Sequence, residues 1–230
     1  MYRKLVLFDI DGTLLKTGSI NRRVLSDALT QVYGTDGNTG RHDFSGKMDG
    51  AIIYEVLEHA GMDRREIDEK FETAKAAYID LFRQSTTPSD ITLLEGVPEL
   101  LEHLSSNNEV LLGLLTGNFE QSGRHKLKLP GIDRYFPFGA FADDARSRND
   151  LPPIAVERAF RLTGKNFSSA EIVIIGDTEH DIKCARVLDA RSIAVATGNF
   201  TMHDLAAHSP CALFENLAPT SDVIREILAP

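Results

Sequence analysis

Short apolar runs that stop at polar turn residues recur along the chain. Residues 5–8, 110–115, 172–175 and 193–196 are almost uninterrupted stretches of Leu, Val, Ile, Phe and Ala. A run this short and continuous is typical of a strand buried on both faces of a sheet, because both sides of the pleat then need apolar side chains. We therefore predict four strands, each followed directly by Asp, Thr or Gly.

Amphipathic helical patterns separate these runs. They cover residues 97–104, 153–162, 179–188 and 220–228, and the second starts with a proline, which suits the first turn of a helix. Strands that alternate with helices require crossover connections, and crossovers produce parallel strands. The pattern predicts an α/β fold whose core is a doubly wound, Rossmann-like parallel sheet.

One long segment interrupts the alternation. Residues 20–85 contain helical patterns at 21–33, 49–59 and 63–83, with Gly34 and Gly61 placed as helix stops, and no convincing strand. We predict a helical cap domain over residues 17–87, inserted into a discontinuous core domain formed by residues 1–16 and 88–230. Two linkers would join the domains, which makes a hinge plausible.

Composition narrows the classes of function. A net charge of -9 argues against a broad nucleic-acid surface, because affinity for a phosphate backbone comes from clustered Lys and Arg. No apolar stretch approaches the roughly 20 residues that span a bilayer, so no membrane association is expected. Cys184 and Cys211 both lie in apolar surroundings, which predicts two reduced, packed thiols and a cytoplasmic protein.

Two carboxylates follow the first predicted strand. Asp9 and Asp11 lie two residues apart in a segment that continues with Gly12 and Thr13, so both leave the strand end on the same side. Such a pair can divide the roles of nucleophile and acid/base, or share a divalent cation. A plain strand-ending turn remains the alternative, since Asp and Gly are common in turns.

Polar clusters also follow two other strands. Thr116, Gly117 and Asn118 offer a hydroxyl and backbone N–H groups suited to an anion, although this segment taken alone is better explained by plain helix capping. Asp177 and Asp181 belong to an acidic cluster that an ordinary helix N-terminus explains only in part. Magnesium usually takes one or two carboxylates, so Asp177 would suffice together with Asp9.

The order of these motifs resembles that of the haloacid dehalogenase superfamily, and the predicted cap is similar to that of its phosphoglycolate phosphatase and phosphoglucomutase branch. The resemblance implies that Asp9 attacks phosphorus to form an aspartyl-phosphate, while Asp11 acts as acid and then as base. It also implies a Mg2+ ion held by Asp9, the Asp11 carbonyl and Asp177, with Asp181 supporting it. The phosphate would lie among Gly12, Thr13, Thr116, Gly117, Asn118 and a basic residue.

The basic residue departs from the family pattern. The family usually has a Lys before the helix that starts near residue 153, whereas this chain has Arg146 and Arg148 there. We predict Arg148, the nearer to that helix, with Arg146 as the alternative. An Arg keeps the charge but binds oxygens through a planar fork.

In the cap, Lys47 and Asp49 lie in a glycine-flanked loop where related caps contact the leaving group, so we expect Lys47 to bind the substrate there unless it is simply solvated.

A phosphatase acting on a small phosphorylated acid or sugar phosphate fits the sequence best. A phosphosugar mutase has the same core residues. Relatives that cleave other bonds lack an acid/base Asp at the position of Asp11, and a non-catalytic binding module would have lost Asp9 or Asp177. Nothing in these patterns specifies an oligomeric state.

Overall fold

A computed structural model describes residues 2–229, and its main feature is a six-stranded sheet in which all neighbouring strands are parallel. The prediction of a doubly wound parallel sheet is confirmed, and the four predicted strands are present. The spatial order is β5 (Gly139–Ala140), β4 (Val110–Leu115), β1 (Lys4–Phe8), β6 (Ile172–Gly176), β7 (Arg191–Val195) and β8 (Ala212–Phe214).

The chain builds this sheet outward from β1, first through β4 and β5 and then, on the other side, through β6, β7 and β8. The direction of building therefore reverses between β1 and β6. In open parallel sheets, ligands bind beyond the carboxyl ends of the strands at such a reversal. The fold places the residues that follow β1 and β6 at this point.

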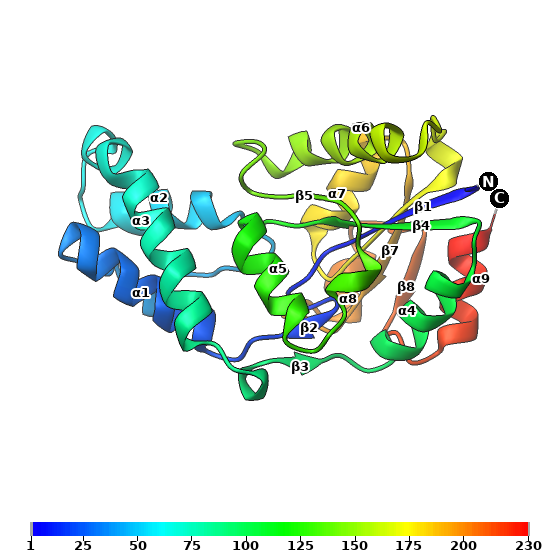
Figure 1. Cartoon of the computed structure of the whole chain (residues 1–230), viewed down its shortest axis with the longest axis horizontal. Helices are drawn as coiled ribbons and strands as arrows, with labels where there is room; N and C mark the ends of the chain where they lie inside the picture. Colours follow the sequence, from blue (N-terminus) through cyan, green and yellow to red (C-terminus); the bar gives the residue numbers. More distant parts are fainter. Residues whose placement is uncertain (1, 230) are drawn as a thin grey trace.

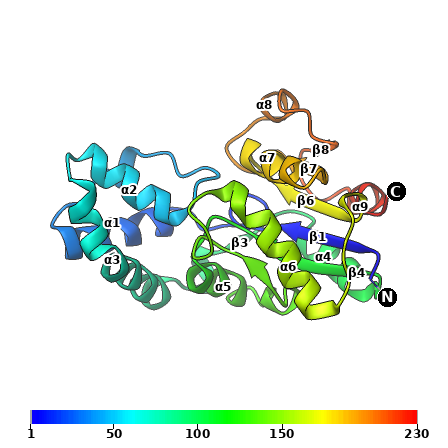
Figure 2. The same cartoon turned by 90° about the horizontal axis from the view of Figure 1, so that it is seen from above.

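Helices cover both faces of the sheet (Figure 2). One layer contains α4 (Val97–Ser106), α5 (Glu120–Lys128) and α9 (Thr220–Leu228), and the other contains α6 (Leu151–Thr163) and α7 (Glu179–Val187). Strand β1 alternates between the layers, with Val6 and Phe8 in the first and Leu5 and Leu7 in the second. Each such buried side chain contributes about 1.5–3 kcal/mol, which fixes the position of the residue that follows the strand.

The segment between β1 and β4 forms a helical lobe at one end of the molecule, and both termini lie at the other end (Figure 1). Its helices are α1 (Ile20–Tyr33), α2 (Asp49–His59) and α3 (Arg64–Ser85), which share an apolar cluster of their own. Gly34 ends α1 with a φ of 77°, as its placement in the sequence indicates. The exact boundaries of a cap domain remain a prediction.

Two short strands connect the lobe to the sheet. Strands β2 (Leu15–Lys16) and β3 (Thr92–Leu93) pair in antiparallel fashion, so the outgoing and returning chains run side by side. Short 3-10 helices occur at Thr39–Arg41, Pro88–Asp90, Asp133–Tyr135, Arg148–Asp150 and Ser169–Glu171, and a short α8 spans Met202–Ala206.

Sequence patterns missed the short edge strands β5 and β8. With two and three residues respectively, both are too short to show a hydrophobic period.

The prediction of two packed thiols is wrong for Cys211, which is exposed because it precedes edge strand β8. Cys184 on α7 is buried, and neither cysteine forms a disulfide. Among residues 2–229, no helix combines the length and apolar character that crossing a bilayer requires.

Candidate active site

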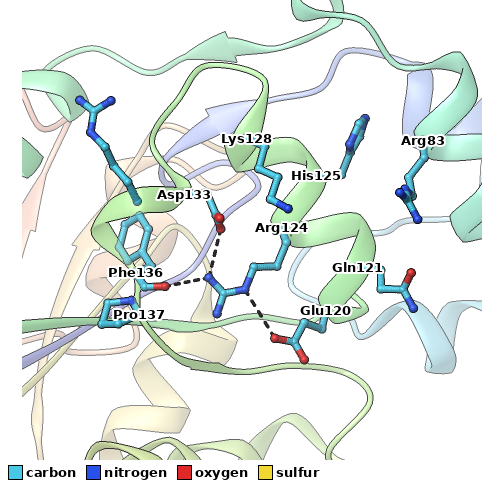
Figure 3. Close-up of a pocket in the computed structure, with 10 residues that line it drawn as sticks. Arg83, Glu120, Gln121, Arg124, His125, Lys128, Asp133, Phe136 and Pro137 are labelled. Carbon is cyan, nitrogen blue, oxygen red and sulfur yellow. Dashed lines mark hydrogen bonds and ion pairs between the residues drawn. The ribbon is translucent and has the colours of Figure 1, made fainter. Parts of the chain in front are cut away.

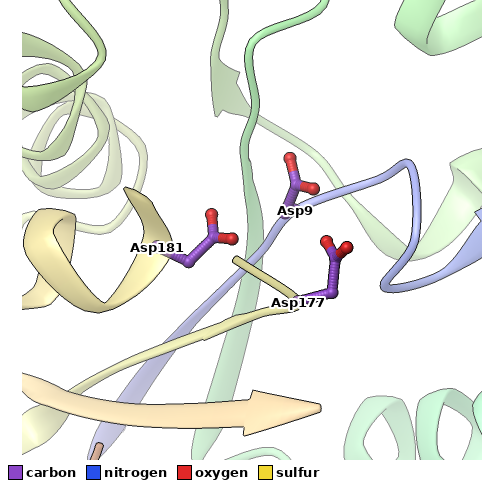
Figure 4. A group of neighbouring side chains, drawn as sticks. All are labelled: Asp9, Asp177 and Asp181. Carbon is purple, nitrogen blue, oxygen red and sulfur yellow. The ribbon is translucent and has the colours of Figure 1, made fainter. Parts of the chain in front are cut away.

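Three buried carboxylates meet where the order of strands reverses. Asp9 directly follows β1, Asp177 directly follows β6, and Asp181 lies in the first turn of α7. One oxygen from each lies within 4.8 Å of the others, and Figure 4 shows the three side chains converging. The structure thus brings together residues that are more than 160 positions apart in the chain.

Arg148 is the cation of this cluster. Its Nη2 donates to Asp9 Oδ1 at 2.9 Å and to Asp181 Oδ1 at 2.5 Å, while Nη1 donates to the backbone carbonyl of Gly46 in the lobe at 3.0 Å. Arg148 is buried, whereas Arg146 is exposed and forms no ion pair with any residue from 2 to 229. The geometry therefore favours Arg148 over Arg146 as the basic residue of the site.

The cluster carries more negative than positive charge. Three carboxyl groups face one guanidinium, so two negative charges would lack a partner if all three were ionised. Burial, reinforced by neighbouring Asp181 and Asp11, raises the pKa of Asp9 to about 7 although Arg148 lowers it. Burial and the charge of Asp9 raise the pKa of Asp177 well above its usual range. A divalent cation would remove this imbalance.

The donor atoms fit a magnesium ion. Both oxygens of Asp181 are already bound, Oδ1 by Arg148 and Oδ2 by the backbone N–H and hydroxyl of Thr178, at 3.0 and 2.8 Å. Asp9 and Asp177 each retain an oxygen that accepts no hydrogen bond from a side chain in residues 2–229. Such hard carboxylate oxygens suit magnesium, and Asp181 lies where it would support the two ligands rather than join them.

Two glycines leave room for Asp177. A Cβ on Gly12 would lie 2.3 Å from Asp177 Oδ2, and a Cβ on Gly198 would lie 1.7 Å from the same atom. Gly12 also has a φ of 86°, which favours glycine. Its N–H donates to the Leu15 carbonyl, and Thr13 Oγ1 donates to Asp177 Oδ1 at 3.2 Å. Here Gly12 and Thr13 shape the acid cluster; their contact with phosphate remains a prediction.

Asp11 has different surroundings from Asp9. Its side chain is 34% exposed, and Oδ2 accepts hydrogen bonds from Lys126 Nζ at 2.7 Å and Asn118 Nδ2 at 2.8 Å. Oδ1 accepts one from Asn21 in the lobe at 3.3 Å. Neither Lys126 nor Asn21 was predicted from the sequence. Lys126 lies in the last turn of α5 with other basic residues, and basic residues are common there because they interact favourably with the helix dipole.

The polar residues after β4 lie beside Asp11. Thr116 is fully buried, and its Oγ1 accepts a hydrogen bond from Asn118 Nδ2 at 2.8 Å, which leaves the hydroxyl hydrogen free to donate. The side chain of Asn118 is committed to Asp11, Thr116 and Lys126. Phosphate binding by residues 116–118, as predicted, would therefore use the Thr116 hydroxyl and backbone N–H groups more readily than the Asn118 amide.

The lobe closes directly onto this loop. Asp49 donates its backbone N–H to the Gly117 carbonyl at 2.7 Å, and its Oδ2 accepts the Phe119 N–H at 2.9 Å. Burial raises the pKa of Asp49 to about 6, although Lys126 lowers it. Asp49 therefore joins lobe and core in this structure.

Lys47 lies apart from the cavity beside Asp11. Its ammonium contacts Glu55 at 2.5 Å and His42 at 3.2 Å. The cavity measures 350 Å³ and is lined instead by Lys16 and Arg22, together with Asn21, Asp11 and Asp177. Lys47 could make its predicted contact with the substrate only by leaving Glu55.

A larger hollow of 660 Å³ lies along α5 (Figure 3), and none of the three clustered carboxylates lines it. Arg124 in this hollow is bound by Asp133, Glu120 and the Phe136 carbonyl. None of the residues predicted for chemistry lines it. The smaller cavity, which contains Asp11 and Asp177, is the candidate active site.

The chain is similar to known proteins over most of its length. A family model described as haloacid dehalogenase-like hydrolase matches residues 6–195. The chain is 25% identical over 215 residues to the pyrophosphatase PpaX of Bacillus velezensis, covering 93% of this chain and 92% of that protein. It is 25% identical over 223 residues to the phosphoglycolate phosphatase of Vibrio vulnificus, covering 96% of each.

Solved structures share the fold. A hydrolase from Pseudomonas syringae superposes with a TM-score of 0.69 at 23% identity, covering 98% of this chain and 99% of that one. A beta-phosphoglucomutase from Clostridium difficile gives a TM-score of 0.69 at 18% identity, covering 99% and 97%.

The contact between lobe and core yields a prediction at Gly117. A Cβ there would lie 2.2 Å from the Lys47 carbonyl oxygen, and backbone atoms cannot rotate away as a side chain can. Gly117→Ala should therefore push the lobe segment at Lys47 away from the core loop at residue 117 and break both hydrogen bonds between Asp49 and the core. At about 1 kcal/mol each, this corresponds to roughly thirtyfold faster hydrogen exchange at the amides of Asp49 and Phe119.

Gly40→Ala is the matched control, because a Cβ at Gly40 in the lobe meets nothing within 4 Å. Its exchange rates at the same two amides should equal those of the unchanged protein. Unaltered exchange in folded Gly117→Ala would show that this contact does not hold the lobe closed.

Proposed function

The chain belongs to the haloacid dehalogenase-like hydrolase family, and from that membership we propose that it is a magnesium-dependent phosphatase that cleaves a small phosphomonoester through an aspartyl-phosphate on Asp9. The sequence-based resemblance to this family is confirmed, and the relatives support the phosphatase class. The observation that carries the proposed mechanism is the position of Asp9, buried at the strand reversal beside a cation and two residues before Asp11.

In the first step, an oxygen of Asp9 attacks phosphorus in line and the bond from phosphorus to the leaving oxygen breaks. Asp11 in its protonated form transfers its proton to that leaving oxygen, so an alcohol departs. In the second step, Asp11, now a carboxylate, removes a proton from a water molecule that attacks the aspartyl-phosphate. The phosphorus–Asp9 bond breaks, and both carboxyl groups return to their starting states.

Charge compensation makes the attack of one anion on another feasible. Arg148 is held beside Asp9 by Asp181, so its guanidinium is already oriented when the phosphate arrives. The Thr116 hydroxyl and neighbouring backbone N–H groups would bind the remaining phosphate oxygens. A bound magnesium ion supplies further positive charge, and Asp9, Asp177 and the Asp11 carbonyl would hold it, supported by Asp181.

The cavity supports a proposal for the class of substrate. At 350 Å³ it suits a small metabolite, and Lys16 and Arg22 favour a leaving group that carries a carboxylate or several hydroxyls. A small phosphorylated acid such as phosphoglycolate, or a sugar phosphate, meets these conditions. We also propose a cytoplasmic location, which the two free thiols support.

A phosphate-release screen tests the proposed reaction. The panel should contain phosphoglycolate, sugar phosphates and pyrophosphate, with magnesium present, and each product should be analysed for isomerised sugar phosphate. Release of inorganic phosphate without an isomer supports a phosphatase. Formation of an isomer without phosphate release would instead identify a mutase.

Asp9→Asn should abolish turnover, because an amide oxygen is a far weaker nucleophile than a carboxylate and removing a covalent nucleophile costs orders of magnitude. The fold should persist, since the replacement has the same shape. Asp27→Asn, at an exposed position on α1, is the control and should keep its full rate. A rate for Asp9→Asn above about a tenth of the original would contradict the assignment of the nucleophile.

Removal of metal should stop the reaction. A chelator should abolish phosphate release and magnesium should restore it, whereas calcium should restore it poorly because calcium prefers more ligands at longer distances. Asp177→Asn should raise the magnesium concentration needed for half-maximal rate by about tenfold or more. Full activity in excess chelator would refute the role of the metal.

Arg148→Ala should lower kcat by about several hundredfold, as expected for the loss of a preoriented charge. Arg148→Lys should recover only part of the rate, because an ammonium keeps the charge but cannot reach Asp9, Asp181 and the Gly46 carbonyl in one plane. Exposed Arg146→Ala is the matched control and should stay within a few-fold of the original rate. A severe loss there, with Arg148→Ala near normal, would reverse the assignment.

A further inference from the structure

Lys126 is a buried cation that binds Asp11, the proposed acid/base residue. Its side chain is only 1% exposed, and its Nζ donates to Asp11 Oδ2 at 2.7 Å and to Asn118 Oδ1. We propose that Lys126 is a positioning residue that fixes Oδ2 of Asp11, so that Oδ1 is the oxygen that exchanges a proton with the leaving group and with water. This inference rests on the proposed phosphatase function.

The surroundings of Lys126 show that packing alone does not explain a lysine there. Its neighbours on the buried face of α5 are Ser122, Gly123 and Leu127, and the ring of Phe82 from α3 lies 5.6 Å from its Nζ. Burying an ammonium is unfavourable unless it is paired, and an apolar side chain of similar length would fill the same space without that penalty. The presence of a lysine at this position is therefore explained by its hydrogen bonds to Asp11 and Asn118.

The two oxygens of Asp11 are held unequally. Oδ2 accepts two hydrogen bonds, one from an ammonium and one from the Asn118 amide, so its lone pairs are engaged. Oδ1 accepts only a longer hydrogen bond of 3.3 Å from Asn21, and Asp11 and Asn21 both line the 350 Å³ cavity. The oxygen free for proton exchange is thus the one beside the lobe.

Asn21 has a polar atom that suits a protonated Asp11. Its Oδ1 is buried and has no hydrogen-bond partner among the residues that the structure describes. The Asn21 atom that now faces Asp11 Oδ1 is Nδ2, so a turn of this amide would let Asn21 Oδ1 accept a proton carried on Oδ1 of Asp11. Lys126 and Asn118 would meanwhile keep the carboxyl plane from rotating, which matters because a misplacement of about 1 Å can cost about a hundredfold in rate.

The decisive experiment combines Lys126→Met with Asp11→Asn. In the original background, Lys126→Met should lower kcat for an alkyl phosphate by about a hundredfold and leave KM within about twofold. In the Asp11→Asn background the same change should cost less than about twofold, because a residue that acts through Asp11 has nothing left to position. Equal losses in both backgrounds would overturn the proposal.

Leaving-group dependence supplies a second readout. An aryl phosphate needs little protonation, so its first turnover, followed as the burst of released nitrophenol, should slow by no more than about fivefold in Lys126→Met. Lys126→Gln should recover part of the alkyl phosphate rate, since its amide can still donate to Oδ2. Equal losses on aryl and alkyl substrates would show a general defect of the site and would count against positioning.

Lys128→Met is the matched control, because Lys128 lies on the same helix, is exposed and forms no ion pair within residues 2–229. Its kcat and KM for the alkyl phosphate, and its burst rate with the aryl phosphate, should equal those of the original protein. If Lys126→Met and Lys126→Gln both unfold while Lys128→Met does not, Lys126 serves stability and the inference fails. Absence of phosphate release by the original protein would instead refute the proposed function.

Discussion

The ion pairs of Arg148 with Asp9 and Asp181 are the interaction on which the rest of the site depends. Three carboxylates are buried together at the end of β1 and β6, and burying like charges without a partner is strongly unfavourable. Arg148 offsets part of that repulsion, and its second nitrogen binds the Gly46 carbonyl in the lobe. One side chain therefore links the acid cluster to the lobe.

Two carboxylates that are only two residues apart lie in different environments. Asp9 is buried against a guanidinium and beside Asp177, which suits a nucleophile that shares a cation. Asp11 is partly exposed toward the cavity and held by Lys126 and Asn118, which suits a group that exchanges protons. Pairs of ionisable groups commonly divide acid/base and nucleophilic work in this way.

Contacts between lobe and core involve backbone groups, an ion pair and apolar side chains. Lys75 of the lobe pairs with Asp143 at 2.5 Å, and Phe119 of the core lies within the apolar cluster of the lobe. Asp49 binds the core through its N–H and its carboxylate, and Gly46 binds it through its carbonyl. Gly117 lacks the Cβ that would collide with the Lys47 carbonyl. The cavity is lined by residues of both lobe and core, so a hinge motion of the lobe would change its shape during substrate entry. The two linkers pair as β2 and β3, which form a small sheet separate from the six-stranded one.

The sequence by itself determined the elements whose signals are local. Continuous apolar runs identified β1, β4, β6 and β7, and the residues directly after them included Asp9, Thr116 and Asp177, because parallel strands bring their carboxyl ends together. Only the tertiary structure decided which of Arg146 and Arg148 reaches Asp9, and that Lys47 pairs with Glu55. It also placed Lys126 against Asp11, across 115 residues of chain. A lysine in the last turn of a helix has the same local pattern whether it faces water or a buried carboxylate, so the difference lies in packing that no local pattern contains.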